Sequence, residues 1–370
     1  PSENFSDGLI HAINLEMQPV AICRLNRFST RTNMPRFLPE PALPFAQQQR
    51  TAVLLLNLGT PAAPTAAAVR PYLREFLSDA RVVELPQWLW QPILQGPVLT
   101  LRPKKSAHGY EKVWLPEGSP LAVFTERQAA ALAQKLPKHI IVRHAMTYGE
   151  PSVPRTLAEL KAQGVGRLLV LPLYPQYAAS SSAAALDKVF AVLQQQRNQM
   201  SVRTISRFYD DAGYIEAMKQ HIEAYWAAHG RSSKLMLSFH GIPQAGHDQG
   251  DPYPEECRHT AQLLAAALGL SEADYLVSFQ SRFGKAKWVG PSTQDLFDSL
   301  PKQGTTTLDV FCPGFAADCL ETMEEIAIAG REQFHAAGGG QFHYIPCLND
   351  NPAWIDALAA LAEENLQGWL

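Results

Sequence analysis

The sequence has no long hydrophobic run, few cysteines and no excess of charge of either sign. No stretch reaches the roughly 18 uncharged apolar residues that a membrane-spanning helix needs, so we expect a chain that does not cross a bilayer. Its five cysteines contain no C-x-x-C pair, which argues against a disulfide framework or a zinc ribbon and favours a reducing, cytoplasmic location. A formal net charge of -3 gives no global basic field, so we expect no nucleic-acid partner.

The composition that is present is typical of a folded protein. With 46% hydrophobic and 18% charged residues, a chain of 370 residues can form one large or two ordinary domains. In residues 1–50 the longest candidate for the apolar core of a secretory signal is the short run Val20–Cys23. We expect this region to be a disordered extension ahead of the folded part.

From Thr51 onward, short apolar runs alternate with helical stretches. The runs lie at 52–58, 140–142, 167–171, 234–239, 275–279 and 307–311. The helical stretches lie at 125–135, 181–197, 214–229, 255–268 and 352–366. This alternation predicts an α/β fold with parallel sheets flanked by helices.

Two pairs of segments echo one another. Leu55–Pro61 and Leu237–Pro243 are apolar strands that end in Gly-x-Pro, and Val170–Pro175 and Val310–Phe315 are strands broken by proline. The echoes predict two similar lobes, at 51–208 and 209–349, with the crossover near 206–211. We expect the last helix, 352–366, to pack back on the first lobe.

His240 stands at the end of an apolar strand, directly before a glycine. In parallel sheets, ligands bind outside the carboxyl ends of the strands, and an imidazole there can accept a proton or bind a metal. The residue alone does not decide between these two roles. A core histidine bonded to a backbone carbonyl is the ordinary alternative.

Glu321 and Glu325 are four residues apart near the start of a predicted helix. They share a helical face, and like charges at this spacing repel unless a cation or a shared proton lies nearby. The alternative is a solvated acidic first turn that the helix dipole favours.

These segments resemble a known signature. Ser238–Pro243 (SFHGIP) together with Cys312–Thr322 (CPGFAADCLET) resembles the signature of the ferrochelatase family. Further matching motifs, in the family's order and spacing, are Leu56–Pro61, Gly118–Leu121, Tyr174–Tyr177, Gly250–Pro254, Gln280–Ser281 and Trp288–Pro291. The resemblance extends from about Thr51 to the C-terminus and is closest to the Gram-negative bacterial form.

The resemblance implies two Rossmann-like lobes around a cleft in which Fe2+ is inserted into protoporphyrin IX with release of two protons, the terminal step of haem biosynthesis. It implies that His240 is the active-site histidine, that Glu321 is its partner carboxylate, and that both are candidate metal ligands. Glu325 matches the next acid of a polar line that relays metal or protons. Some members have a histidine where this chain has Cys319.

The resemblance also implies substrate-binding residues. Those at the macrocycle or its propionates are Leu58, Tyr110, Ser119, Arg143, Tyr177 and Trp288. We add His144, because it follows Arg143 at the end of the predicted strand 140–142, where both charges would point at the cleft. A surface ion pair for Arg143 and a core position for Tyr177 are the alternatives.

An apolar segment at 86–97, with Trp88 and Trp90, precedes Arg102, Lys104 and Lys105. It predicts either a buried helix or a hydrophobic lip in peripheral contact with a membrane.

Some ferrochelatases hold a [2Fe-2S] cluster on four cysteines. The cysteines here, Cys23, Cys257, Cys312, Cys319 and Cys347, are scattered, so we expect no cluster and no permanently bound cofactor. We expect a monomer.

The main alternative function is a carrier that binds a tetrapyrrole or a metal in the same cleft without catalysis. A nucleotide-dependent enzyme is disfavoured because no G-x-G-x-x-G or G-x-x-x-x-G-K-[ST] motif follows a predicted strand. Preference for protoporphyrin over a more carboxylated porphyrin, and for iron over other divalent metals, stays open at this point.

Overall fold

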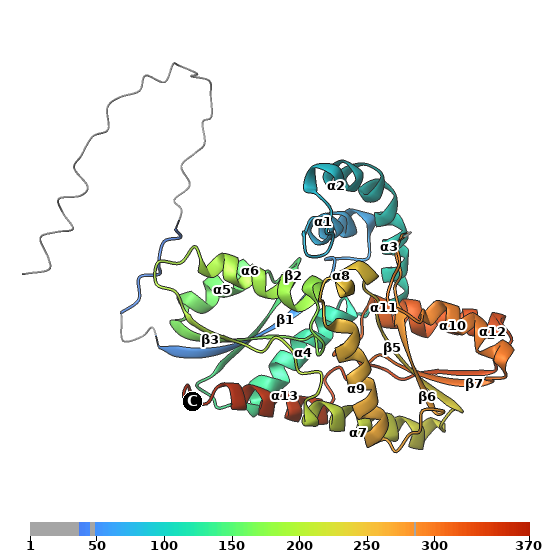
Figure 1. Cartoon of the computed structure of the whole chain (residues 1–370). Helices are drawn as coiled ribbons and strands as arrows, with labels where there is room; N and C mark the ends of the chain where they lie inside the picture. The colour runs from blue at the N-terminus through green and yellow to red at the C-terminus, as the bar shows by residue number, and fades with distance from the viewer. Residues whose placement is uncertain (1–36, 45–48, 285) are drawn as a thin grey trace, which may run out of the picture. The chain divides into compact units, whose positions relative to one another are not determined.

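Two four-stranded parallel sheets organise the part of the chain that the computed structural model describes, residues 37–44, 49–284 and 286–370 (Figure 1). The first sheet has the order β2-β1-β3-β4 and the second the order β6-β5-β7-β8. The first contains β1 (Arg50–Gly59), β2 (Ile141–Tyr148), β3 (Val165–Pro172) and β4 (Ser201–Thr204). The second contains β5 (Lys234–His240), β6 (Tyr275–Gln280), β7 (Thr307–Phe311) and β8 (Gln341–Tyr344). The predicted α/β fold with two similar lobes is confirmed.

The echoing segments occupy equivalent places in the two sheets. β1 and β5 are second in their sheets, and β3 and β7 are third. Within β1, Val53 and Leu55 face one hydrophobic core, whereas Ala52, Leu54 and Leu56 face another. A central parallel strand is covered on both faces, which is why it reads as a continuous apolar run.

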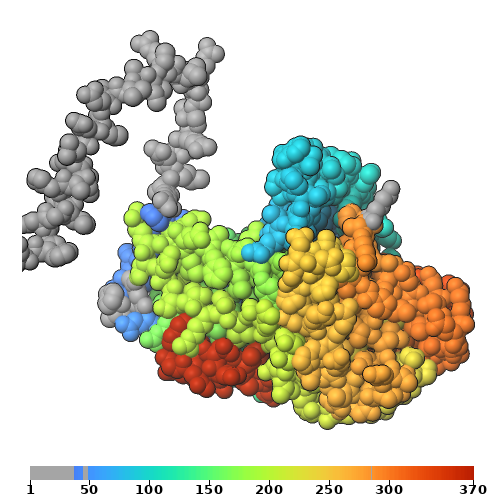
Figure 2. Space-filling view, viewed as in Figure 1, coloured from blue at the N-terminus to red at the C-terminus, as the bar shows by residue number. Residues whose placement is uncertain are grey.

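A group of helices follows β1 and has a core of its own. It comprises α1 (Ala66–Leu77), α2 (Gln87–Ile93), the π-helix η2 (Leu94–Val98) and α3 (Leu99–Val113). Figure 2 shows this group, in light blue and cyan, protruding beside the segments of the second sheet.

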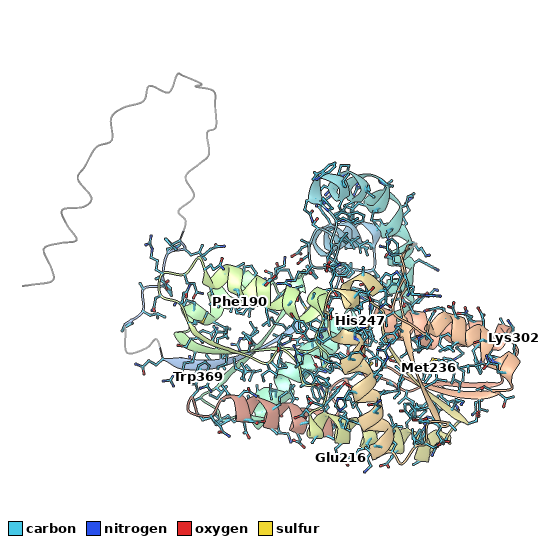
Figure 3. All side chains as sticks on the ribbon, viewed as in Figure 1. Phe190, Glu216, Met236, His247, Lys302 and Trp369 are labelled. Atoms are coloured by element: carbon cyan, nitrogen blue, oxygen red, sulfur yellow. The ribbon has the colours of Figure 1, made fainter. Side chains whose placement is uncertain are left out.

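The remaining helices flank the sheets. In the first half they are α4 (Pro120–Lys135), α5 (Val153–Ala162), the π-helix η3 (Ala179–Ala183) and α6 (Ala184–Leu193). In the second half they are α7 (Ala212–His229), α8 (Gln244–Asp248), α9 (Tyr253–Ala267), α10 (Thr293–Ser299), the 3-10 turn η4 (Pro301–Gln303), α11 (Leu320–Thr322), the π-helix η5 (Met323–Gly330) and α12 (Arg331–Ala336). In Figure 3, Met236 lies within the second sheet, where it is buried, whereas Phe190 on α6 is exposed.

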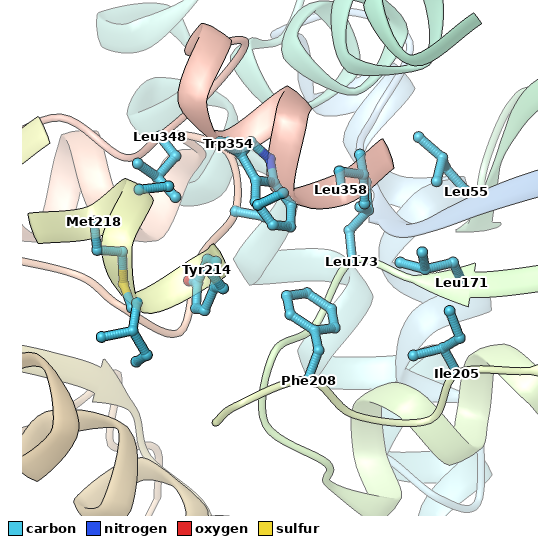
Figure 4. Packing of buried hydrophobic residues seen from close by; sticks show 14 of the residues in the cluster. Leu55, Leu171, Leu173, Ile205, Phe208, Tyr214, Met218, Leu348, Trp354 and Leu358 are labelled. Carbon is cyan, nitrogen blue, oxygen red and sulfur yellow. The ribbon is translucent and has the colours of Figure 1, made fainter. Parts of the chain in front are cut away.

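The last helix, α13 (Pro352–Asn365), packs against both α4 and α7. Its Trp354 is fully buried and stacks on Phe208, with ring centroids 5.7 Å apart, and meets the edge of Tyr214 at 5.1 Å (Figure 4). Large aromatic rings in such offset and edge contacts bury much apolar area. The C-terminal helix therefore shares a core with the crossover that leads into the second sheet.

The edge strands differ most from the strands predicted from the sequence. β4 and β8 were not predicted, because both are short and largely polar. β2 runs to Tyr148 and not only to Val142, since Arg143 and His144 interrupt its apolar pattern. An edge strand pairs on one side only and tolerates polar side chains that a central strand does not.

The predicted disordered extension, 1–50, lies mostly outside the described residues. Residues 37–44 are described and lie against the connection between α6 and β4. Leu38 donates its N–H to the carbonyl of Gln195 at 2.8 Å, and Glu40 forms an ion pair with Lys161 at 3.2 Å. Glu40 also accepts two backbone N–H groups, which holds this short piece in place.

In the described part of the chain, no helix is both apolar and long enough to span a bilayer.

Candidate functional site

His240 is the last residue of β5, between the neighbouring strands β6 and β7. Its ring Nδ1 lies 2.6 Å from the carbonyl oxygen of Gly241. Because a carbonyl can only accept, this hydrogen bond requires the proton on Nδ1 and leaves the lone pair on Nε2. The half-buried ring thus presents Nε2 as a base or a metal ligand.

Gly241, the residue directly after His240, allows Trp288 to pack close to the end of β5. A Cβ at position 241 would lie 2.8 Å from the carbonyl oxygen of Gln280 and 3.2 Å from the Trp288 ring. Only glycine therefore permits this approach. Trp288 is fixed by a hydrogen bond from its Nε1 to the carbonyl of Phe283 at 2.9 Å, which holds the ring close to Gly241. Its role in binding substrate stays a prediction.

Glu321 lies in the first turn of α11, just after β7 and its proline-containing loop. The hydroxyl of Thr322 accepts the backbone N–H of Cys319 at 2.9 Å and donates to Asp318 at 3.0 Å. Asp318 is itself buried and accepts from the amide of Asn349 at 2.7 Å. These bonds fix the start of the helix and so the place of Glu321.

Glu321 shares a small pocket with residues of the first half of the chain. The pocket is lined by Leu58, Gly59, Thr60, Tyr72, Tyr110, Ser119, Leu121, Cys319, Leu320 and Glu321. Three predicted substrate-binding residues, Leu58, Tyr110 and Ser119, therefore lie together with the predicted carboxylate. Two further hydroxyls in this lining, those of Thr60 and Tyr72, were missed by the sequence analysis, although Thr60 is part of a quoted motif.

The hydroxyl groups of this pocket are neutral donors. Thr60 donates to Ser119 at 2.7 Å. Burial, followed by the charge of Glu321, raises the pKa of the Tyr110 phenol above its ordinary value. Such neutral hydroxyls can donate hydrogen bonds to carboxylate oxygens of a ligand without adding a charge.

Glu325 lies in the π-helix η5, four residues after Glu321. It accepts a hydrogen bond from the hydroxyl of Ser281 at 2.5 Å. Burial, and then the negative charges of Glu321 and Glu324, raise its pKa to about 7, against the lowering effect of Ser281. A carboxyl group with this pKa can take up and release protons near neutral pH.

Ser281 adopts a positive φ of 65°, which is uncommon for a residue other than glycine. Strained residues of this kind cluster at functional sites. In the sequence, Ser281 is recognisable only as part of the short motif Gln280–Ser281. By contrast Glu324, between the two predicted acids, pairs with Lys112 on α3 at 2.9 Å.

Tyr177 lies after β3, at the carboxyl end of the first sheet. Its backbone N–H donates to the buried Glu256 of α9 at 2.7 Å, and the Arg207 guanidinium lies 4.8 Å from the centre of its ring. Arg207 also pairs with Glu256 at 2.5 Å. Asp251 accepts the N–H of Ala179 at 2.8 Å, so residues of the second half hold this loop of the first.

The prediction that Arg143 and His144 face the cleft is wrong. They pair with Leu54 and Leu55 in the middle of the sheet, several residues before β2 ends. Arg143 donates to the carbonyl of Val142 at 2.8 Å, and burial lowers the pKa of His144. The longer strand therefore keeps both side chains away from its carboxyl end.

The apolar segment 86–97 divides into a buried and an exposed part. Trp90 is 8% exposed and donates its Nε1–H to the carbonyl of Leu77 at 2.6 Å, whereas Trp88 is 76% exposed. The exposed large apolar side chains on and near this segment are Leu85, Trp88, Leu89, Ile93 and Leu101. Of the two predicted alternatives, the buried helix therefore holds for Trp90, which belongs to the core, and the lip stays a prediction for the exposed residues.

The four described cysteines, Cys257, Cys312, Cys319 and Cys347, are free and buried. Cys23 lies outside the described residues. Within the described ranges, no group of three or more histidine, cysteine, aspartate or glutamate side chains is arranged to hold a metal ion. The expectation of no iron–sulfur cluster stays a prediction.

Comparison with solved structures supports the fold. SirB from Bacillus subtilis with Fe3+ matches with a TM-score of 0.52 at 13% identity, over 85% of this chain and 95% of that one. The sirohydrochlorin chelatase SirB from Bacillus subtilis subspecies spizizenii in complex with cobalt matches with a TM-score of 0.51 at 12% identity, over 86% and 96%. At such low identity the likeness shows the two-lobed chelatase architecture alone.

Sequence comparison identifies the family. Residues 50–366 match the family model described as ferrochelatase. A ferrochelatase of Neisseria meningitidis serogroup C is 75% identical over 333 residues, which cover 90% of this chain and 99% of that protein. A ferrochelatase of Nitrosomonas europaea is 50% identical over 340 residues, covering 91% and 93%. The chain belongs to the ferrochelatase family.

Proposed function

We propose that this chain inserts Fe2+ into protoporphyrin IX to form protohaem, and that His240, Glu321 and Glu325 carry the chemistry. The observation that carries the proposal is the arrangement of the site. An imidazole with a free Nε2 ends one central strand, and a carboxylate lies in a pocket with Leu58 of the equivalent strand. Family membership supports the same reaction.

The reaction needs two proton acceptors and a route for one cation. The two pyrrole N–H protons leave as Fe2+ forms bonds to the porphyrin nitrogens, so charge balances without an oxidant. Nε2 of His240 can take a proton or bind the metal on its way in, and Glu321 can do either. Glu325, with a pKa of about 7, can pass protons or metal along η5.

The porphyrin is a flat apolar disc with two carboxylates. We propose that Leu58 and Trp288 contact its faces, and that Tyr110 and Ser119 donate hydrogen bonds to its polar groups. Tyr177 lies at the same end of the first sheet and completes this set. The proposal leaves out Arg143 and His144, because their strand position points them elsewhere.

A passive tetrapyrrole or metal carrier is the competing function. His240→Ala separates the two, because a carrier needs no proton acceptor in the cleft. We expect this variant to bind protoporphyrin with unchanged affinity, measured by fluorescence, and to insert Fe2+ about a hundredfold more slowly under anaerobic assay. Wild-type protein that binds porphyrin but never metallates it would favour the carrier.

We further propose that the exposed residues of the segment 86–97 touch a membrane surface, where an apolar porphyrin partitions. Arg102, whose guanidinium lies 4.2 Å from the centre of the exposed Phe283 ring, follows this segment and can meet anionic headgroups. Trp88→Ser should weaken binding to vesicles of anionic lipid and leave the melting temperature unchanged. Trp90→Ser is the contrasting variant, since it removes a buried ring and should destabilise the fold by about 3 kcal/mol or more.

We propose a monomer without a resident cofactor. Light scattering of the purified protein tests the first point. Its absorption spectrum tests the second, because an iron–sulfur cluster absorbs visible light.

A further inference from the structure

Gln280 ends β6, beside the strand end that carries His240. The two residues are paired in register, and the carbonyl of Gln280 accepts the N–H of Gly241 at 2.8 Å. Gln280 is fully buried. In the sequence it is recognisable only as part of the short motif Gln280–Ser281. An amide side chain neither accepts a proton nor binds Fe2+ in the proposed reaction.

The side-chain amide of Gln280 joins the two halves of the catalytic pair. Its Nε2 donates to the backbone carbonyl of Glu321 at 2.8 Å. Its Oε1 accepts from the hydroxyl of Ser238, two residues before His240, at 2.8 Å. Cys312 and Thr293 complete this buried network. Because both ends of the amide are engaged in a buried site, its orientation is fixed.

The carbonyl that Gln280 binds lies where the helix changes its pairing. α11 ends at Thr322 and the π-helix η5 begins at Met323. A helix that changes from i+4 to i+5 hydrogen bonds leaves a carbonyl in need of another donor at the change. Gln280 supplies a donor to Glu321 at this place. The backbone of Glu321 is therefore held by a residue of strand β6.

We propose that Gln280 is a positioning residue for metal insertion, which fixes Glu321 relative to His240 and acts through them. The inference rests on the proposed function and deepens it. Small displacements of reacting groups are costly, since a shift of about 1 Å can lower a rate about a hundredfold.

The experiment compares Gln280→Met with Gln128→Met. Methionine keeps the length and apolar bulk of the side chain and removes the amide. Gln128 is the matched control, because it is also fully buried and donates to two backbone carbonyls, those of Ala316 at 2.9 Å and Asn349 at 2.7 Å. For each protein we would measure kcat and KM for metal insertion, porphyrin affinity by fluorescence, and the melting temperature.

We expect Gln280→Met to lower kcat at least about tenfold with porphyrin affinity unchanged. Gln128→Met should lower the melting temperature as much and keep kcat within about twofold. Equal kcat losses in the two variants, with an active wild type, would overturn the positioning role. A wild type that inserts no metal would instead overturn the proposed function, and this inference with it.

A second variant keeps the test decisive if Gln280→Met does not fold. Ser238→Ala removes the donor to Oε1 and leaves the amide in place. It should lower kcat in the same direction by a smaller factor, with porphyrin affinity unchanged. Full kcat in Ser238→Ala, with the melting temperature lowered, would count against the proposal.

Discussion

Leu58 and His240 hold equivalent places in the two halves of the molecule and do different things. Each comes directly before a glycine at the carboxyl end of the second strand of a sheet, in sheets of the same strand order. The first end presents an apolar side chain among the hydroxyls of Tyr110 and Ser119. The second presents an imidazole. The architecture repeats the position of these side chains. In the proposed function their chemistry divides the work, since Leu58 holds a flat ligand and His240 moves protons or metal.

The strongest test of this division is Glu321→Gln, which keeps the shape of the side chain and removes its charge. We expect turnover to fall about a thousandfold, with porphyrin affinity within about twofold of the wild type. The reason is that Glu321 is proposed to accept a proton or bind the metal, and not to hold the porphyrin. Single-turnover assays and fluorescence titration measure the two quantities. Glu324→Gln is the matched control, since Glu324 pairs with Lys112 and should not be needed. Equal losses in both variants would contradict the assignment.

Alanine substitutions at the two equivalent positions, 58 and 240, test whether porphyrin binding and metal insertion depend on different residues. His240→Ala should lower kcat about a hundredfold and keep porphyrin affinity. Leu58→Ala should weaken porphyrin affinity about tenfold, since it removes apolar contact, and keep kcat. A kcat loss without an affinity loss in Leu58→Ala would show that the two halves are not divided in this way.

Free imidazole then separates the two roles of His240. Partial rescue of His240→Ala with a similar fraction for Fe2+ and Zn2+ indicates proton transfer. A rescue that differs sharply between the metals indicates ligation, because metals differ in their affinity for nitrogen.

The raised pKa of Glu325 predicts how the stability of the fold changes with pH. Its pKa of about 7 in the folded chain lies above the ordinary value near 4.5, so the unfolded chain releases this proton first as pH rises. The fold therefore loses stability between about pH 4.5 and pH 7, by about 3 kcal/mol for this group. Glu325→Gln should lack this loss, so its melting temperature should gain on the wild type as pH rises from 5 to 8. Parallel curves would contradict the raised pKa.

The smallest expected effect concerns Glu256 of α9, which accepts the backbone N–H of Tyr177 and so links the two halves of the chain. Burial raises the pKa of Glu256, and Arg207 opposes this rise. Arg207→Gln should raise that pKa further, so the variant should lose stability relative to the wild type as pH rises above about 5. We expect about 1 kcal/mol at pH 8, since Arg207 is half-exposed. Arg258→Gln is the control, because Arg258 pairs with the exposed Glu255 and should show no such slope.

Much of the fold and part of the site could be predicted from the sequence. The central strands were visible because burial on both faces makes them continuous apolar runs, and His240 was visible because it breaks such a run before a glycine. Leu58, Tyr110 and Ser119, which were predicted to bind substrate, line one pocket with Glu321. Arg143 and His144 were misplaced because the polar pattern of an edge strand hides where the strand ends.

The sequence by itself determined the alternation of strands and helices, the repeated lobes and the residue types at their strand ends, because these depend on neighbours along the chain. Only the tertiary structure decided which of two nearby tryptophans is buried, which proton acceptor has a pKa of about 7, and that Gln280 holds the carbonyl of a residue 41 positions later. Burial, desolvation and such hydrogen bonds depend on segments that meet only after folding.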